Sequence, residues 1–333
     1  MAVRREKKRV NLRDVARAAD VSVATVSRVL NAPQVVQKQT RERVLEAIDT
    51  LGFHPSAAAR AINSGRSRIL GALIPTLDNA IFASTIEAIE KRLGDFGYSL
   101  VVATTGGDPG QELRRARELL DIGVEGFFLS GITHDDALVT LLENRGVPII
   151  AISHFDTGYR YPTIGYDNRE AARKALDHLI AQGHRAITVL HGPPQHDDRT
   201  RARLEGIRDT PKDISIRYHM APELSAAGGT DAAVQVLEQD NEIDAFLCLS
   251  DILAFGVLFE LQRRRIIVPT DIAVMGVHDL PLAATIAPRL STVRLPARQM
   301  GTHAAEALAL WLDEDIRPEP KCFATTLIQR ETT

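Results

Sequence analysis

Cysteine is scarce in this chain of 333 residues. The two cysteines, Cys248 and Cys322, lie far apart and form neither a CxxC motif nor the Cys/His spacing of a zinc site. No apolar run reaches the ~18 residues that cross a membrane, and the opening segment, MAVRREKKRV, lacks the apolar core of a signal peptide. We therefore expect a cytoplasmic protein that contacts no membrane, in a reducing compartment without disulfides.

Catalytic motifs are absent as well. The sequence has no GxSxG, no P-loop, no GxGxxG after a strand and no cluster of metal-ligand residues. We expect no enzymatic activity, no cofactor and no metal. The composition, 44% hydrophobic and 25% charged, is that of a soluble globular protein, and the length predicts about two to three domains.

The charge is unevenly distributed along the chain. Residues 1–66 contain 13 Lys and Arg against 6 Asp and Glu, a net of +7. Subtraction from the chain totals of 40 and 43 leaves 27 and 37, a net of −10. A basic head on an acidic body is typical of a nucleic-acid-binding segment attached to a separate soluble domain.

The segment 11–31 predicts two short helices joined by a tight turn. Asn11 caps the first helix, with Asp14 as its reciprocal partner, and Asp20 tolerates the left-handed backbone of the turn. Ser22 caps the second helix. The side chains expected to face inward are Val15, Ala16, Ala19, Val26, Val29 and Leu30.

The second helix leaves short side chains and one arginine outside. They are Val23, Ala24, Thr25, Ser27 and Arg28. A face of this kind lets a helix enter the major groove of DNA. An ordinary helical hairpin is the alternative interpretation, and the basic charge of the head favours DNA binding.

A loop over 32–36 and a third helix over 38–51 follow, with Gly52 ending the helix. Its apolar residues at helical spacing are Val44, Leu45, Ile48 and Leu51. Beyond Pro55, the Ala-rich segment 57–63 has high helix propensity but only about two turns, which is marginal for an isolated helix. Residues 64–67 indicate a linker.

From Ile69 onward, short apolar runs alternate with amphipathic segments. The runs predict strands buried on both faces, at 69–74, 98–103, 124–130, 147–153, 186–192, 214–220, 244–250 and 272–278. Helices are expected near 81–96, 110–122, 135–145, 168–182, 200–208, 229–239 and 252–264. The predicted fold class is α/β, a small helical head joined to two doubly wound parallel-sheet halves.

From Asn11 onward the sequence resembles the LacI/GalR family of bacterial transcription repressors. The resemblance rests on DVA…A.VS..TVSRVLN, TRERV…I..LGFHPS, AAARAI, GHRAI, SDILAFG, VP.DIAVMG and LSTVRLP. It implies a homodimer that binds pseudo-palindromic operator DNA and a body like a periplasmic sugar-binding protein. Within the family, GVHDLP and FELQRRRIIVPTDIA resemble the branch that controls gluconate and related sugar-acid operons.

The resemblance also implies a division of the chain. A helix-turn-helix domain would occupy 1–54, a hinge helix and linker 55–68, and an effector-binding and dimerisation body 69–333. The body would consist of one subdomain at about 69–160 plus 294–321 and another at about 161–293 plus 322–333. A small effector would bind in the cleft between them.

The resemblance assigns roles in DNA binding to individual residues. Val23, Ala24 and Arg28 would read bases, with the arginine donating to guanine O6 and N7. Thr25, Ser27, Asn31 and Arg41 would contact phosphates. In the hinge helix, Ala59 and Ile62 would contact DNA. Ile62 stands where the family usually has leucine and would wedge into the minor groove when two hinges pair.

Ligands of doubly wound sheets bind beyond the carboxyl ends of the strands. The loops that follow the predicted strands contain Asn79, Ile81, Phe82, Ser153, His154, Ser250, Asp251, His278 and Asp279. The family resemblance adds Arg203, which would clamp the effector. Ser153 and His278 stand where relatives often carry aspartate, and this loss of two carboxylates favours an anion such as gluconate.

Several alternatives remain open. Asp251 is equally well interpreted as a helix cap, and Phe82 as a core residue. A sugar-acid-processing enzyme with an accessory DNA-binding head is the alternative function, since His and Asp in a cleft can do acid–base chemistry. A transport-associated binding protein is a third possibility, against which the missing signal peptide argues.

Overall fold

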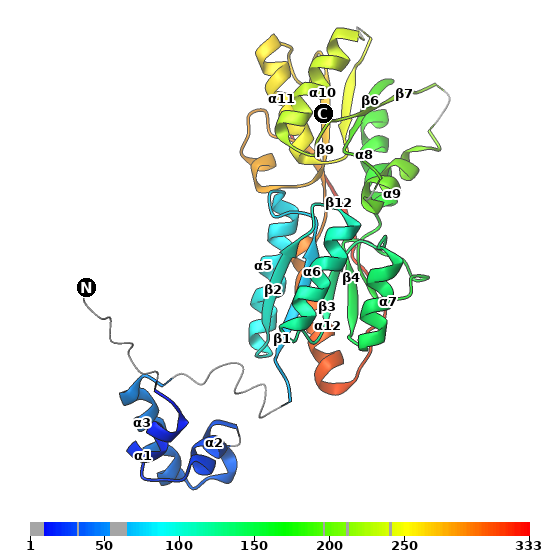
Figure 1. Ribbon diagram of the computed structural model, residues 1–333. Coiled ribbons are helices and arrows are strands. Elements are labelled where there is room, and N and C mark those ends of the chain that lie inside the picture. The colour runs from blue at the N-terminus through cyan, green and yellow to red at the C-terminus, as the bar shows by residue number, and fades with distance from the viewer. Residues whose placement is uncertain (1–9, 32, 54–64, 196, 211–212, 240–241) are drawn as a thin grey trace, which may run out of the picture. The chain divides into compact units, whose positions relative to one another are not determined.

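The computed structural model describes residues 10–31, 33–53, 65–195, 197–210, 213–239 and 242–333. The chain divides into two compact units, Met1–Arg68 and Ile69–Thr333 (Figure 1). In the described part of the chain, no helix is both long enough and apolar enough to cross a membrane.

The first unit is a small helical head. Its elements are α1 (Leu12–Ala18), α2 (Val23–Asn31), a 3-10 turn, η1 (Pro33–Val35), and α3 (Lys38–Leu51). The predicted caps are confirmed: Asn11 accepts from the amides of Arg13 and Asp14, and Asp14 accepts from the amide of Asn11 at 3.1 Å. Asp20 has a φ of 52°, and the Ser22 hydroxyl accepts from the amide of Thr25 at 3.1 Å.

The head has its own apolar core. It consists of Val15, Ala16, Ala19, Val26, Val29, Val44, Ala47 and Phe53, with Leu30, Ile48 and Leu51 packed against them. Leu45, the fourth apolar residue noted in the sequence of this helix, lies outside the core and is 49% exposed. Residues 44, 47, 48 and 51 follow the helical repeat, whereas Leu45 lies about 100° around the helix from Val44. The expected loop over 32–36 also contains η1.

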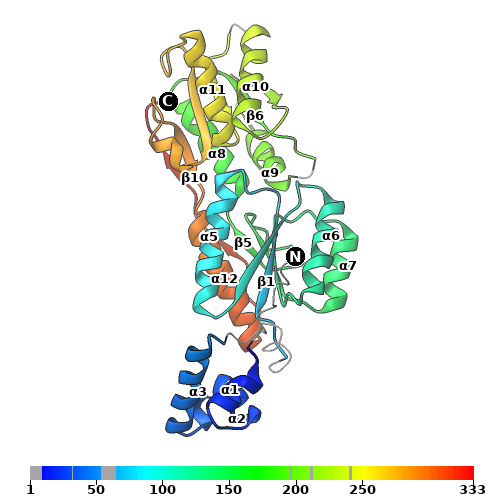
Figure 2. The same ribbon diagram turned by 60° about the vertical axis from the view of Figure 1, so that its left-hand side comes forward.

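The N-subdomain of the second unit is a three-layer sandwich (Figures 1 and 2). Its sheet has the order β11-β5-β4-β3-β1-β2 with parallel pairing throughout. The strands are β1 (Ile69–Ile74), β2 (Ser99–Thr104), β3 (Phe127–Ser130), β4 (Ile149–Ile152), β5 (Thr163–Gly165) and β11 (Lys321–Cys322). Helices α5 (Ala80–Asp95) and α12 (Ala297–Glu314) cover one face, and α6 (Pro109–Asp121) and α7 (Asp136–Arg145) the other.

The C-subdomain repeats this plan with the strand order β12-β10-β9-β8-β6-β7. Its strands are β6 (Ala186–His191), β7 (Ser215–Met220), β8 (Ala245–Cys248), β9 (Ala273–His278), β10 (Ser291–Arg294) and β12 (Thr326–Ile328), which runs antiparallel to β10. Helix α8 (Asn168–Ala181) packs with α9 (Asp198–Ile207), and α10 (Ala226–Gln239) with α11 (Asp251–Arg264). A 3-10 turn, η2, covers Pro281–Ala284.

The chain crosses between the two sheets three times. β5 still pairs with β4 in the first sheet, so the first crossing follows Gly165 and the expected boundary at 160–161 is too early. The second crossing lies between β10 and α12. The third lies between β11 and β12, which moves Cys322 into the N-subdomain.

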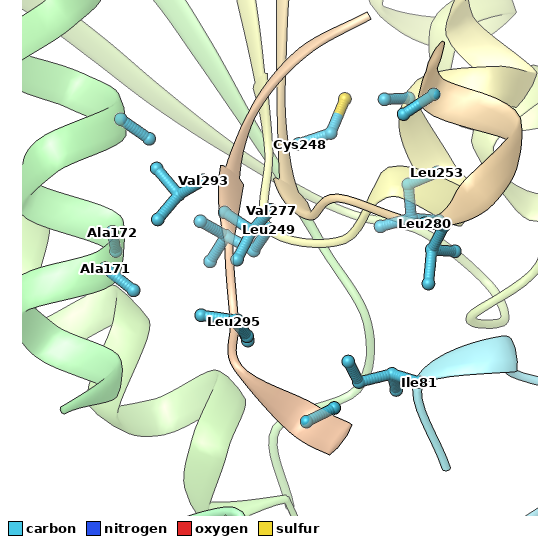
Figure 3. Packing of buried hydrophobic residues seen from close by; sticks show 14 of the residues in the cluster. Ile81, Ala171, Ala172, Cys248, Leu249, Leu253, Val277, Leu280, Val293 and Leu295 are labelled. Carbon is cyan, nitrogen blue, oxygen red and sulfur yellow. The ribbon is translucent and has the colours of Figure 1, made fainter. Parts of the chain in front are cut away.

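Two of the predicted strands are not buried on both faces. β2 and β7 form the outer edges of their sheets, and most of their side chains are partly or fully exposed. The interior strands, such as β4 and β9, are fully buried as expected. Figure 3 shows part of the core of the body, with Ala171 and Ala172 of α8 facing Val293 and Leu295, and with Ile81 near Leu295.

Candidate functional site

Helix α2 presents a short-chained face to solvent. Val23 is 41% exposed, Ala24 and Arg28 are exposed, and Thr25 and Ser27 are half-buried. The Thr25 hydroxyl lies 2.9 Å from that of Ser22, so it also supports the start of the helix. This face has the shape needed to enter a major groove, with Arg28 as its long donor.

The structure describes some, but not all, of the other residues that we expect to contact DNA. Arg41 lies in the first turn of α3 and is half-buried, and Asn31 is the last residue of α2. The segment 56–63, with Ala59 and Ile62, lies outside the described residues. Its assignment as a hinge helix that wedges into the minor groove stays a prediction.

A small cavity lies between the two subdomains, next to Arg203. Its lining consists of Asn79, Ile81, Phe82, Tyr166, Gly192, Asp197, Arg199, Thr200, Arg203, Leu224, Leu249 and His278. Five of the expected effector residues are therefore brought together: Asn79, Ile81, Phe82, Arg203 and His278. The cavity volume is about 30 Å³, far below the ~300 Å³ or more of pockets that hold small ligands. The cleft is closed in this conformation.

Arg203 is the most firmly positioned side chain of the cavity. Its Nε donates to Asn168 Oδ1 at 3.1 Å, and its Nη1 donates to the Leu249 carbonyl at 2.7 Å. Asn168 in turn donates from Nδ2 to the Ser153 carbonyl at 3.1 Å. The guanidinium is thus held by two groups of the C-subdomain, and Asn168 links it to the N-subdomain; among the described residues Nη2 has no partner. That atom can donate to a ligand.

The charged groups of the cavity include two arginines and Asp197. Asp197 stays ionised: burial opposes the charge, but Arg199, the Thr200 hydroxyl and Arg203 bring its pKa down to about 2. Burial, together with Arg203, holds the pKa of His278 well below its ordinary value, so this imidazole is neutral at pH 7. The buried carboxylate of Asp198 lies 3.9 Å from Arg199 Nε, so two arginines and two carboxylates balance around the cavity.

The other expected effector residues do not line this cavity. Ser153 and Ser250 are buried behind it, with the Ser250 hydroxyl 3.2 Å from His278 Nδ1. Both carboxylate oxygens of Asp279 accept from arginines, Arg294 at 2.7 Å and Arg330 at 2.6 Å. Asp279 is thus neutralised within the protein.

Asp251 is fully buried at the start of α11. It accepts from the Thr292 hydroxyl at 2.6 Å and from the Leu280 amide at 2.8 Å. This geometry favours a structural role, because the two oxygens tie β10 and the loop after β9 to the start of α11. Burial raises the pKa of Asp251 to about 6. His154 lies on the loop after β4, beside Asp198 of α9.

Comparison with known proteins agrees with this architecture. Residues 11–56 match the model of the bacterial regulatory proteins of the lacI family, and residues 176–333 match a periplasmic binding protein-like domain. The HTH-type transcriptional regulator GntR of Escherichia coli K12 is 32% identical over 306 residues, covering 91% of this chain and 92% of that protein. The chain belongs to the LacI family. It is a DNA-binding transcriptional regulator.

Solved structures support the same assignment. The Lac repressor dimer bound to operator and the anti-inducer ONPF superimposes with a TM-score of 0.86 at 25% identity, covering 98% of this chain and 99% of that one. The transcription regulator GntR from Chromobacterium violaceum gives 0.72 at 29% identity, covering 79% of this chain and 98% of that one.

Sequence reasoning missed several residues of this LacI-family cleft. Arg199 is 7% exposed, donates from Nε to Asp197 at 2.9 Å, and places its guanidinium 5.6 Å from the centre of the Phe82 ring. Asp197, Thr200 and Tyr166 were missed too. The available signal was spacing, because residues 199 and 203 are four apart and share one helix face.

A second hollow, of about 150 Å³, also includes Arg199. It lies at the carboxyl ends of β1, β2 and β3, and the loop after β2 contributes Thr105, Gly107 and Asp108. Buried His134 contacts Glu112 there at 2.9 Å. No metal-binding group of three or more His, Cys, Asp or Glu occurs among the residues that the structure describes.

Proposed function

We propose that this protein is a repressor of a carbohydrate or sugar-acid operon, which binds a pseudo-palindromic operator as a homodimer and is controlled by a small sugar acid such as gluconate. The helical head supports DNA reading through the exposed face of α2. The observation that carries the choice of effector is the guanidinium of Arg203 at the interdomain cavity, whose Nη2 has no partner among the described residues.

The polar groups of the cavity match the carboxylate and the hydroxyl groups of a sugar acid. The free Nη2 of Arg203 can donate to a carboxylate. Asp197 and neutral His278 can exchange hydrogen bonds with hydroxyl groups. A neutral sugar could use the same hydroxyl contacts but has no carboxylate to accept from Arg203 Nη2.

A thermal-shift comparison of gluconate with glucose tests this proposal. A ligand that binds the native state at a hundredfold excess over its Kd stabilises it by about 2.7 kcal/mol. We expect gluconate or a close sugar acid to raise the Tm, and glucose to leave it unchanged.

Two variants of Arg203 sharpen this comparison. Arg203→Ala should abolish the thermal shift, and Arg203→Lys should not restore it, because an ammonium group cannot reproduce the planar fork. A shift by neutral sugars alone, or an undiminished shift in Arg203→Ala, would contradict the assigned effector class.

A further inference from the structure

The carboxylate of Asp198 crosses the cleft between the subdomains. Asp198 is the first residue of α9, in the C-subdomain, and it is 7% exposed. Its Oδ2 accepts from the backbone amides of Ile132 and Thr133, the latter at 2.9 Å, in the loop that follows β3 of the N-subdomain. An aspartate of one subdomain therefore occupies an anion-binding loop of the other.

The loop is shaped for this contact. Gly131 has a φ of +91°, and a Cβ at that position would lie 2.5 Å from Asp198 Oδ2. A larger residue would meet the carboxylate and would also be strained at this backbone angle. We call the loop residues Gly131, Ile132 and Thr133 the socket.

Neighbouring contacts close the cleft around the socket. Arg199 Nη1 donates to the Ser130 hydroxyl at 2.8 Å, and Arg201 Nη2 donates to the Thr133 hydroxyl at 2.7 Å. Asp198, Arg199 and Arg201 all lie in the first turn of α9. The turn thus joins the two subdomains at the edge of the effector cavity.

The other oxygen of Asp198 is incompletely satisfied. Asp198 Oδ1 and His154 Nδ1 are 4.0 Å apart, and both atoms are buried without a hydrogen-bond partner in the described structure, although Oδ1 also lies 3.9 Å from Arg199 Nε. Buried polar groups without partners are unfavourable. Separation of the subdomains would return both atoms to water, so the closed form is held by the socket and opposed by this pair.

We propose that Asp198 is a positioning residue that latches the cleft closed and so limits effector entry. The cavity of about 30 Å³ is too small for an effector, and the cleft must open before a ligand can bind. Opening breaks the two amide bonds to Asp198, which are charge-assisted and part-buried and converge on one carboxylate oxygen. The latch rests on the proposed effector role of the cleft but not on the chemical identity of the effector.

Spin-label distance measurement on the full-length protein tests the latch. Labels are placed at the exposed positions Thr140→Cys on α7 and Arg208→Cys after α9, with exposed Cys322 changed to serine. Labelled protein is mixed with an excess of unlabelled protein, so that each pair of labels reports on one chain. Wild type should give one short distance. Asp198→Ala should raise the ratio of open to closed molecules roughly tenfold.

The matched control is Asp136→Ala, because Asp136 is also the first residue of a helix but is exposed and outside the socket. It should keep the wild-type distance. Gly131→Ala, which changes the socket and leaves Asp198 in place, should also open the cleft. An unchanged distance distribution in both Asp198→Ala and Gly131→Ala would overturn the proposal, and so would equal opening in Asp136→Ala.

Discussion

Arg28 is the long hydrogen-bond donor on a recognition face otherwise made of short side chains. Its guanidinium can donate two hydrogen bonds to guanine, whereas Val23 and Ala24 offer only apolar contact, which suits a thymine methyl. At the scale of single residues, DNA reading is therefore concentrated in one side chain.

We predict that Arg28→Ala lowers specific operator affinity by about 1–3 kcal/mol and relaxes the preference at one guanine per half-site. Selection of binding sites from a random duplex library, with wild type and variant in parallel, measures both effects. Arg17→Ala is the control, since Arg17 is exposed on α1, outside the recognition helix. Identical base preferences in wild type and Arg28→Ala would show that the assignment is wrong.

Asp251 makes stability depend on pH. Burial raises its folded-state pKa to about 6, above the ~3.9 of an unfolded chain. Between these values the folded state keeps the proton and the unfolded state does not. The free energy of unfolding should therefore fall by about 3 kcal/mol as the pH rises from about 4 to about 6.

Chemical denaturation of wild type and Asp251→Asn over this pH range measures the contribution. The variant should lose this part of the pH dependence, whereas Asp121→Asn, at an exposed position, should follow wild type. Parallel curves for wild type and Asp251→Asn would contradict the raised pKa.

At the scale of elements, α10 and α11 pack with their backbones in near contact. A Cβ on Gly256 of α11 would lie 2.1 Å from the Ala226 carbonyl oxygen of α10, and one on Gly229 would lie 2.3 Å from the Leu253 carbonyl oxygen. The Thr230 hydroxyl donates across the pair to the Gly256 carbonyl at 3.1 Å. The two glycines set the distance between the helices.

We predict that Gly256→Ala destabilises the body by roughly 1–3 kcal/mol, because the helices must move apart. Thermal unfolding measures the loss. Gly94→Ala in α5 is the matched control: its Cβ would meet nothing within 4 Å, and alanine favours a helix by up to about 1 kcal/mol. A lower Tm in the control than in Gly256→Ala would refute this account of the helix contact.

The elements differ in how well the sequence predicts them. The helix-turn-helix and the long strands of the two sheets are visible because caps and apolar runs are local signals. β5 and β11 have only three and two residues and show no pattern of their own. α12 follows Pro296, which makes no side-chain cap, so its start carries no signal. These elements depend on the sheets into which they pack.

The residues of the candidate site were likewise predicted only where the signal is local in the sequence. Loops after strands place Asn79, Ile81, Phe82 and His278 at the cavity, because the carboxyl ends of parallel strands meet at one edge. Arg199 and Asp198 were not found, since their partners Ser130 and Ile132 lie in the other subdomain. The four-residue spacing from Arg203 marks the helix face of Arg199, but a contact formed by two sheets depends on their packing, and neither segment shows its partner in the other subdomain.

At the scale of the whole molecule, we propose that a DNA-reading head is coupled to a ligand-controlled cleft. Effector binding can change operator affinity only if the effector binds the two conformations of the body unequally. The closed cavity and the contacts of Asp198 and Arg199 provide one of those conformations. An opened cleft is the other.

The most direct test is the operator affinity of the full-length protein with and without the sugar acid that raises its Tm. An operator obtained by library selection is titrated by fluorescence anisotropy. The account predicts that the acid changes wild-type affinity by about 5- to 150-fold and leaves Arg203→Ala unaffected, while both proteins bind equally well without the acid. An operator affinity in wild type that stays the same with and without the acid would contradict the account.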